Sequence, residues 1–402
     1  MNVIHLNQHL AAKGGVETYL LEVLPKLEQQ GVHSIWVYAE GDASLWRHSI
    51  SFPALSKPKA THTDQRALKK HLEALNADVI HIHNIQNADL VETCFSICPT
   101  IITNHDYRWI CPANNFFFKN DRTVCQKDCG NLGCFTTTLR KHCLTPRPAF
   151  ALPFYRRIRQ MKAGHSQLSH TIAPSPIAAE RLIRAGWDQT KITVLPYFCP
   201  LEVRYAPRPI PAIPTISYVG RIAPNKGHLS FIRALGQLPS NWQGILAGDI
   251  DENVATHLMQ EAIKYDCADR LQLKPWANRK EVLEIMDSST VFIFPSLWEE
   301  TLGIVALEAL SRGVPVVSSN IVGVEHWLNT LKCGISVPPN DAMAIAGAVI
   351  SLSASDESLI HAGTSGIQLI KDQFSPDVHT TKLLEIYQSA LQDTRYNDSR
   401  ST

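Results

Sequence analysis

The chain has 402 residues, of which 45% are hydrophobic and 19% are charged, a composition typical of folded globular proteins. Its 38 Lys and Arg residues nearly balance its 37 Asp and Glu residues, so the net charge is +1. This disfavours a dedicated nucleic-acid binder, because such domains are usually strongly basic. Residues 1–15 lack the basic and apolar segments of a secretory signal, and no apolar run reaches the roughly 18 residues of a membrane-spanning helix. We therefore expect a cytoplasmic protein with reduced cysteines.

Strands and helices are predicted to alternate along the first half of the chain. Short apolar runs predict strands at 3–6, 35–38, 79–83, 100–103, 170–173 and 192–195. Apolar residues at helical spacing predict helices at about 20–27 and 175–186. Alternation of this kind indicates an α/β fold with a mostly parallel sheet covered on both faces.

The alternation stops in a proline-rich stretch and then resumes. Six prolines lie between Pro196 and Pro214, and proline this dense sustains neither a helix nor a central strand. Strands are predicted again at 215–219, 244–248, 291–294 and 314–318. We expect two α/β domains, residues 1–197 with a Cys-rich insert at about 107–145 and residues 215–376, joined by a linker at 198–214 beside a cleft.

Two loops that lead from a predicted strand into a helix carry candidate binding residues, since ligands of open α/β sheets bind beyond the carboxyl ends of the strands. Gly14 and Gly15 form either a tight turn or a close approach to a phosphate at a helix N-terminus. Arg221 and Lys226 place two cations at a helix start, where the helix dipole disfavours them. A bound anion would resolve that conflict; a solvated surface pair is the alternative.

A third segment of this kind, residues 294–310, contains two acids eight residues apart. Glu300 lies in the loop, whereas Glu308 has only apolar neighbours in the sequence. A carboxylate is costly to bury unless something pairs with it. The hydroxyl groups of a ligand would satisfy Glu308; an internal salt bridge or a charge near the helix N-terminus are the alternatives.

Together these segments resemble the glycosyltransferases of family 4. The matching segments, in order, are GGVE from Gly14, DVIHIHN from Asp78, TNHDY around His105, IAPS ending at Ser175, GRIAPNKG from Gly220, AGD around Gly248, and PSLWEETLGIVALEALSRGVPVV from Pro295. The last resembles the E-x7-E signature of the family, with Glu300 and Glu308 as its acids. The resemblance implies the GT-B fold, in which two Rossmann-like domains with parallel sheets face a cleft between them.

The resemblance also implies a reaction. It is a retaining, metal-independent transfer of a sugar from a nucleotide-diphosphate sugar to a glycan, here a lipid-linked intermediate of a cell-surface polysaccharide, with no catalytic cofactor. Arg221 and Lys226 would hold the diphosphate and stabilise the leaving nucleotide. Gly14 and Gly15 would face the phosphates. In the same matching, Glu308 would bind the ribose.

Further positions follow from the same resemblance. Glu300 would lie at the donor sugar, where Thr301, Leu302 and Gly303 would offer backbone amides, and Gly248 would belong to the donor site. His105 would lie at the sugar and acceptor side of the first domain, with Asp106 orienting either its ring or the chain. Tyr197 stands where relatives often have asparagine, in Pro-Asn-Gly. A C-terminal helix at about 377–394 would return to the first domain.

The insert contains half of the cysteines of the chain: Cys111, Cys125, Cys129, Cys134 and Cys143. Thiolates suit a tetrahedral structural zinc site, for which His142 is an alternative ligand. Such a site would hold a loop near His105 in place and perform no chemistry. Buried reduced thiols and labile disulfides are the alternatives.

Residues 139–170 contain seven Lys and Arg and no acid, mixed with aromatic and aliphatic residues. This mixture fits docking on a membrane surface, here the inner face of the cytoplasmic membrane. A solvated helix or a site for an anionic acceptor are the alternatives.

Two other functions compete with the transferase. A nucleotide-sugar hydrolase or epimerase would use the same fold, and a non-catalytic, metal-stabilised interaction protein would be built around the Cys-rich insert. The second predicts binding of zinc but not of nucleotide. The motifs encode neither the nucleotide, the sugar, the acceptor nor the linkage.

Overall fold

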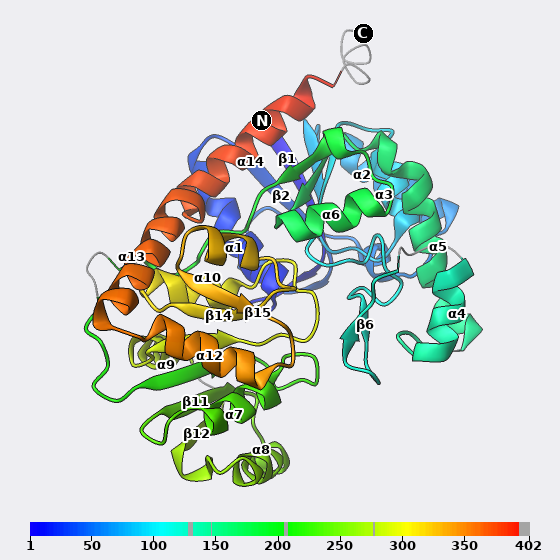
Figure 1. Ribbon diagram of the computed structural model, residues 1–402. Coiled ribbons are helices and arrows are strands. Elements are labelled where there is room, and N and C mark those ends of the chain that lie inside the picture. Colours follow the sequence, from blue (N-terminus) through cyan, green and yellow to red (C-terminus); the bar gives the residue numbers. More distant parts are fainter. Residues whose placement is uncertain (128–131, 146, 205–207, 276–277, 394–402) are drawn as a thin grey trace. The chain divides into compact units, whose positions relative to one another are not determined.

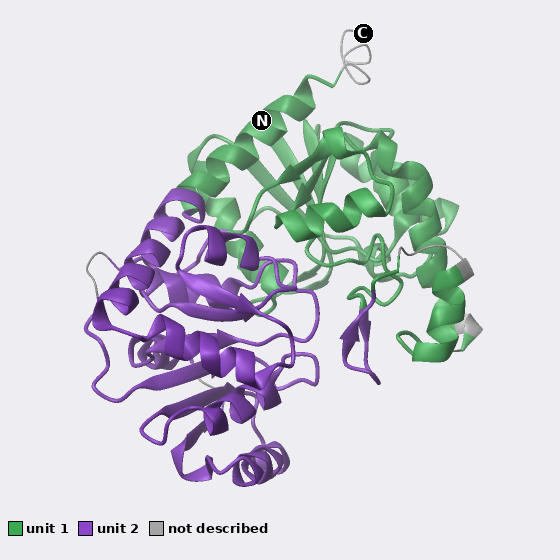
Figure 2. Cartoon of the chain, in the orientation of Figure 1, with its two compact units in different colours: residues 1–116, 126–197, 376–402 green, residues 117–125, 198–375 purple. Residues whose placement is uncertain are grey.

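The computed structural model describes residues 1–127, 132–145, 147–204, 208–275 and 278–393. The chain divides into two compact units (Figure 2). Unit 1 comprises residues 1–116, 126–197 and 376–402, and unit 2 comprises residues 117–125 and 198–375. Part of the predicted insert, residues 117–125, thus groups with unit 2, as does the predicted linker.

Unit 1 contains a seven-stranded parallel sheet in the order β3-β2-β1-β4-β5-β8-β9 (Figure 1). Its strands are β1 (Asn2–Leu10), β2 (His33–Gly41), β3 (Ser49–Ser51), β4 (Val79–Ile82), β5 (Thr100–Thr103), β8 (His170–Ala173) and β9 (Ile192–Val194). All six strands predicted for this half are confirmed, and the short, polar β3 was not predicted. Val3, Ile4 and Leu6 are all fully buried, because a parallel sheet is covered on both faces.

The helices of unit 1 include one from the far end of the described chain. They are α1 (Gly15–Gln29), α2 (His62–Ala74), α3 (Ala88–Cys94), α4 (Leu132–Lys141), α5 (Pro148–Gly164), α6 (Pro176–Arg184) and α14 (Pro376–Leu391), with short 3-10 turns at Ala43–Leu45, Pro53–Ser56, His165–Gln167 and Gln189–Lys191. Helix α14, red in Figure 1, packs against α1 and β4. The hydroxyl group of its buried Tyr387 forms a hydrogen bond with His81 Nδ1 at 2.7 Å.

Unit 2 contains a six-stranded parallel sheet in the order β12-β11-β10-β13-β14-β15. Its strands are β10 (Thr215–Val219), β11 (Gln243–Gly248), β12 (Leu271–Pro275), β13 (Val291–Phe294), β14 (Val316–Ser319) and β15 (Gly334–Val337), and residues 117–125 add the hairpin β6 (Phe117–Phe118) and β7 (Thr123–Val124). The helices are α7 (His228–Gln237), α8 (Glu252–Lys264), α9 (Arg279–Asp287), α10 (Ile304–Ser311), α11 (Glu325–Thr330), α12 (Ala342–Leu352) and α13 (Asp356–Gln373), with a 3-10 turn at Ala268–Arg270. The four predicted strands are confirmed, and the described residues of 196–204 and 208–214 form neither helix nor strand.

Within the described ranges, no single helix combines the length and the apolar character needed to cross a membrane. One strongly bent combination, Ala342–Leu352 with Asp356–Leu391, meets that criterion by length and composition only.

Candidate functional site

The three loops selected from the sequence share one backbone feature. Each ends in a glycine with positive φ that serves as a helix N-cap: Gly14 (φ 124°) for α1, Gly227 (φ 73°) for α7 and Gly303 (φ 101°) for α10. No side chain caps any of these three helices. Helices α5 and α11 also lack a side-chain cap but have no glycine at the N-cap, whereas serine, threonine, asparagine or aspartate side chains cap α2, α3, α6, α8, α9, α12 and α13. An uncapped N-terminus presents amide donors and partial positive charge, which suits an anion.

In unit 2, Lys226 and Glu300 form an ion pair near the ends of two of these loops. Lys226 Nζ lies 2.7 Å from Glu300 Oε1, and both side chains are mostly buried. Ser296 Oγ donates to the same carboxylate oxygen at 3.1 Å. Lys226 Nζ also lies 5.1 Å from the centre of the Trp298 ring, and the buried Trp298 Nε1 has no hydrogen-bond partner within the described residues.

Arg221 differs from Lys226 in that its side chain is exposed. No ion pair holds its guanidinium in the part of the chain that the structure describes. Its backbone is fixed, because Tyr218 Oη donates to the Arg221 carbonyl at 2.9 Å. Gly248 lies behind this loop, where a Cβ atom would overlap the Gly220 carbonyl. Close packing of the ends of β10 and β11 therefore explains why this position is glycine.

Glu308 lies on α10 beyond its first turn. The described residues provide no salt bridge or hydrogen bond for its carboxylate, so neither alternative from the sequence accounts for it. Burial raises the pKa of Glu308 to about 7, and the positive charge of Arg279 opposes this only in part. A half-buried carboxyl group without a partner is costly to ionise, so a ligand that donates hydrogen bonds to it would be favoured.

In the loop before α10, the neighbouring acids Glu299 and Glu300 have different surroundings. Glu299 is buried, whereas Glu300 forms the ion pair with Lys226. The Glu300 and Leu302 carbonyls accept hydrogen bonds from the turn at 323–324, which fixes the loop. The amides of Leu302 and Gly303 donate to no backbone carbonyl of the described chain. Thr301 lies in the same loop and is half-buried.

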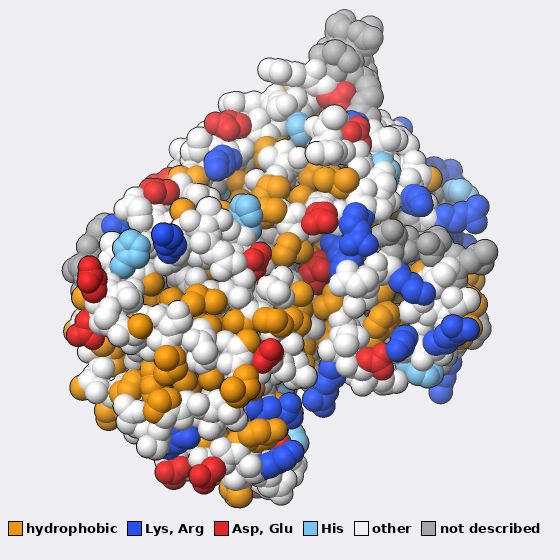
Figure 3. Space-filling model, in the orientation of Figure 1, with side chains coloured by type: hydrophobic (Ala, Val, Ile, Leu, Met, Phe, Trp, Pro, Cys, Tyr) orange, Lys and Arg blue, Asp and Glu red, His pale blue; other side chains and the backbone are white. Residues whose placement is uncertain are grey.

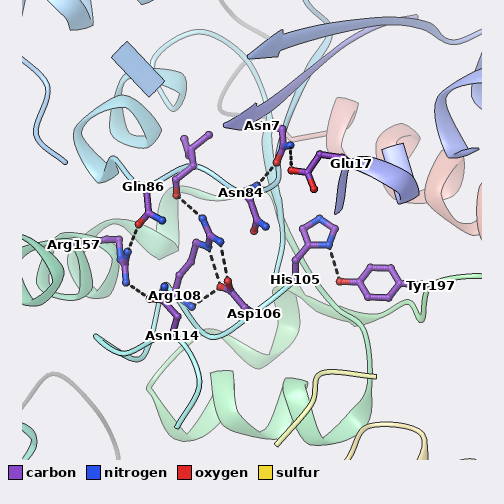
Figure 4. Close-up of polar contacts among 11 residues, drawn as sticks. Asn7, Glu17, Asn84, Gln86, His105, Asp106, Arg108, Asn114, Arg157 and Tyr197 are labelled. Carbon is purple, nitrogen blue, oxygen red and sulfur yellow. Dashed lines mark hydrogen bonds and ion pairs between the residues drawn. The ribbon is translucent and has the colours of Figure 1, made fainter. Parts of the chain in front are cut away.

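In unit 1, the glycine loop is anchored through α1 (Figure 4). Asn7, within β1, donates from Nδ2 to Glu17 Oε1 at 3.0 Å, and its Oδ1 accepts from the Asn84 amide at 3.0 Å. A side chain at Gly14 would overlap the Glu17 carboxylate. Gly15 has open space where a Cβ would lie, so packing within unit 1 requires glycine only at position 14.

His105 is held by ring contacts that the sequence did not predict (Figure 4). Its Nδ1 lies 2.7 Å from Tyr197 Oη, and its Nε2 lies 2.9 Å from His83 Nδ1. Asp106 instead pairs with Arg108, to which its carboxylate is bonded at 2.8 and 2.9 Å. Burial lowers the pKa of His105 to about 3, so its ring is neutral at pH 7.

The same hydrogen-bonded chain continues into the core. His83 Nε2 lies 3.2 Å from His5 Nδ1, and the nitrogens of His5, His81 and His83 are close enough together to hold a metal. However, both ring nitrogens of His81 already contact hydroxyl groups at 2.7 Å, and both of those of His83 contact other histidines. We therefore interpret this cluster as structural.

The structure describes four of the five cysteines of the predicted zinc site. Cys129 lies outside the described residues. Cys111, Cys125 and Cys134 are buried and Cys143 is half-buried. Neither group of described residues that would suit a metal contains a cysteine, and no disulfide joins the described cysteines to one another. Burial raises the pKa of Cys143, and zinc stays a prediction.

Family models identify both halves of the chain. A model described as Glycosyltransferase Family 4 matches residues 13–203, and one described as Glycosyl transferases group 1 matches residues 211–368. The chain is a glycosyltransferase of the family 4 type. This assignment favours an enzyme over the non-catalytic alternative.

The glycosyltransferase has curated relatives in polysaccharide synthesis. It is 26% identical over 258 residues to the lipopolysaccharide core biosynthesis glycosyltransferase LpsE of Rhizobium meliloti, covering 61% of this chain and 74% of that protein. It is 27% identical over 231 residues to the putative colanic acid biosynthesis glycosyltransferase WcaL of Escherichia coli, covering 54% and 55%. The chain thus spans little more than half of the second relative.

Solved structures show the GT-B fold of this glycosyltransferase. Anabaena Alr3699/HepE, determined in complex with UDP, has a TM-score of 0.70 and 16% identity, covering 97% of this chain and all of that one. The lipopolysaccharide outer core galactosyltransferase WaaB has a TM-score of 0.69 and 14% identity, covering 97% and 99%. The expected α/β class and GT-B fold are therefore confirmed.

Proposed function

We propose that the enzyme transfers a sugar, with retention, from a nucleotide-diphosphate sugar to a lipid-linked glycan of a cell-surface polysaccharide. The observation that carries the donor assignment is the uncapped start of α10 beside the Lys226–Glu300 pair. The UDP complex of the HepE neighbour and the polysaccharide roles in the names of its relatives support it.

Each donor-site residue then has a physical role. As the bond from the sugar to the phosphate breaks, negative charge grows on the leaving nucleotide, and Arg221, Lys226 and the amides of Leu302 and Gly303 would stabilise that charge. A diphosphate carries more negative charge than one carboxylate, so Lys226 would turn from Glu300 to the phosphates. Glu300 would then accept hydrogen bonds from the donor sugar.

The remaining residues would fix the donor. Glu308 would accept hydrogen bonds from the ribose, and the Trp298 indole N–H would donate a hydrogen bond to the nucleotide sugar. In unit 1, the open start of α1 at Gly14 and Gly15 would face the phosphates. His105, neutral and held by Tyr197, would lie at the acceptor side and position the substrate without exchanging a proton.

Nucleotide binding tests the donor site. Calorimetry of UDP, GDP, ADP and CMP should find one diphosphate that binds selectively. Arg221→Ala and Lys226→Ala should each weaken that affinity at least tenfold, because charge-assisted hydrogen bonds contribute about 1.5–3 kcal/mol. Arg66→Ala, an exposed arginine of unit 1, serves as the control. If folded protein binds none of the nucleotides, the donor site is wrong.

A surface of unit 1 supports docking at the membrane. Phe135 and Leu139 on α4 and Phe150 and Leu152 on α5 are all exposed, and Lys and Arg side chains gather over the same helices (Figure 3). Not every cation of residues 139–170 takes part. Arg157 is buried and bonds to Gln86 and Asn114, and Arg156 pairs with Asp89. The other Lys and Arg side chains of this segment, together with the exposed apolar side chains, fit an anionic lipid surface.

Vesicle sedimentation tests this docking. The protein should bind vesicles rich in anionic lipid, and Phe150→Ser/Leu152→Ser should lower binding at least tenfold, because each side chain contributes about 1.5–3 kcal/mol when buried. Ile263→Ser/Met343→Ser is the matched control, since these unit 2 residues are as exposed (68% and 66%) as Phe150 and Leu152 (63% and 68%). Equal losses in both variants would contradict the assignment.

A further inference from the structure

Unit 2 contains a cavity of about 320 Å³ at the first turns of α7 and α8, a volume at the lower end of small-molecule sites. Apolar side chains such as Leu229, Val254 and Leu297 form part of its wall, and Asn253 and Asn340 form another part. None of the described residues that line it is acidic. Lys226 and Glu300 do not line it, although Ile222, Gly227 and Leu297 of the same two loops do, so the cavity adjoins the proposed donor site without including its charged side chains.

Helix α7 begins at this cavity without a cap. Gly227 is its N-cap residue, no side chain accepts from its first turn, and that turn has no acid. The neighbouring α8 is capped, because Asp251 accepts from the Val254 amide at 2.8 Å. The start of α7 therefore supplies unused amide donors and partial positive charge to the cavity wall.

His228 provides a second, independent observation. Its side chain lines the cavity, the residue is only 8% exposed, and Nδ1 has no hydrogen-bond partner. Burial lowers its pKa to about 4, so the ring is neutral at pH 7. We assign the ring proton to Nε2, because a backbone hydrogen bond to Ala223 opposes the shift and Nδ1 has no partner within the described residues. Nδ1 is then a buried acceptor, and a hydroxyl group of a ligand would satisfy it.

Three cationic or basic side chains surround this acceptor. Arg233 lines the cavity, and its Nε forms an ion pair with Glu261 Oε1 at 2.6 Å. Arg122, from the β6–β7 hairpin, is exposed and has no ion-pair partner within the described ranges. His257 lies on the exposed side of α8. His257 and Arg122 line the same cavity as His228.

We propose that this cavity binds an anionic sugar, that is, a sugar with a phosphate or carboxylate group. The anion would lie against Arg122, His257 and the start of α7, and a sugar hydroxyl would donate to His228 Nδ1. Inorganic phosphate would satisfy only the cations, and a neutral sugar would satisfy only the acceptor. Both should therefore bind more weakly than a molecule that has the two groups.

Calorimetry with glucose 6-phosphate, glucuronate, inorganic phosphate and glucose tests this site. An anionic sugar should bind at least tenfold more tightly than glucose and more tightly than phosphate. Arg122→Ala/His257→Ala should weaken this binding at least fivefold. Lys119→Ala/Lys264→Ala, which removes exposed lysines from the same hairpin and helix, should leave it unchanged. His228→Phe should remove the preference over inorganic phosphate, and the exposed double variant decides if His228→Phe does not fold.

Equal affinity for glucose and the anionic sugars, or an affinity unchanged in Arg122→Ala/His257→Ala, would overturn the proposal. The donor-site variants Arg221→Ala and Lys226→Ala should retain anionic-sugar binding while they lose nucleotide, so the two proposals fail independently. Incubation of the protein with the nucleotide sugar and the anionic sugar shows whether the bound anionic sugar is an acceptor or an effector. A glycosylated sugar phosphate or uronate as product identifies an acceptor group, and binding without product identifies a free effector.

Discussion

Glu308→Gln is expected to stabilise the protein above pH 7 while it weakens nucleotide binding. Burial raises the pKa of Glu308 in the folded state to about 7, whereas an unfolded glutamate titrates near 4.3. Between these values the folded protein binds more protons, so its stability falls as the pH rises. The full cost of ionisation, about 4 kcal/mol, applies above pH 7, and glutamine removes it.

Denaturant unfolding at pH 4 and pH 8 measures this effect. The stability gain of Glu308→Gln should be near zero at pH 4 and reach about 4 kcal/mol at pH 8. Glu284→Gln, an exposed glutamate of α9, should change little at either pH. If Glu308→Gln instead destabilises the protein at pH 8, the carboxylate has a partner in the free enzyme, and its proposed role as a ribose acceptor loses its physical basis.

Gly227→Ala is expected to cost more than about 3 kcal/mol of stability, through the left-handed backbone (about 1–2 kcal/mol) and a displaced loop. Gly227 has φ 73°, and a Cβ atom there would overlap the Pro295 carbonyl. This contact lets two loops pack together: the Leu297 amide donates to the Asn225 carbonyl at 2.8 Å. The packing places Lys226 beside Glu300.

Gly31→Ala is the matched control, because Gly31 also has positive φ (81°) but open space around it. It should cost only about 1–2 kcal/mol, the backbone contribution alone. Unfolding of both variants by denaturant separates the two contributions. Equal costs would mean that the glycine after Lys226 serves the backbone angle and not the contact between the two loops.

The sequence predicted the α/β alternation well, because buried parallel strands are short apolar runs such as Val291–Phe294. The unpredicted strands lack that signal. Strand β12 (Leu271–Pro275), at one edge of its sheet, has a polar residue after each of its leucines. Strand β15 (Gly334–Val337), at the other edge, begins with glycine. Edge strands need less apolar surface, so their composition identifies them poorly.

The motif loops were also found from the sequence, whereas the pairing of their side chains was not. Lys226 and Glu300 are 74 residues apart, and His105 and Tyr197 are 92 residues apart. Such contacts depend on which strands become neighbours, which local patterns do not encode. Trp298 was missed although it lies beside Glu300. An indole within a predicted ligand loop was the available signal.

The return of α14 to unit 1 affects the order in which the protein can fold during synthesis. Unit 2 is nearly continuous in the sequence (198–375), but unit 1 needs residues from 376 onward. His81 obtains Tyr387 as its partner, and Tyr19 obtains His379, only from that last helix. At 5–20 residues per second the ribosome needs roughly 10–35 s to translate the intervening unit. All seven strands of the N-terminal sheet are therefore translated before unit 2, but part of the core of unit 1 stays uncovered until α14 has been made.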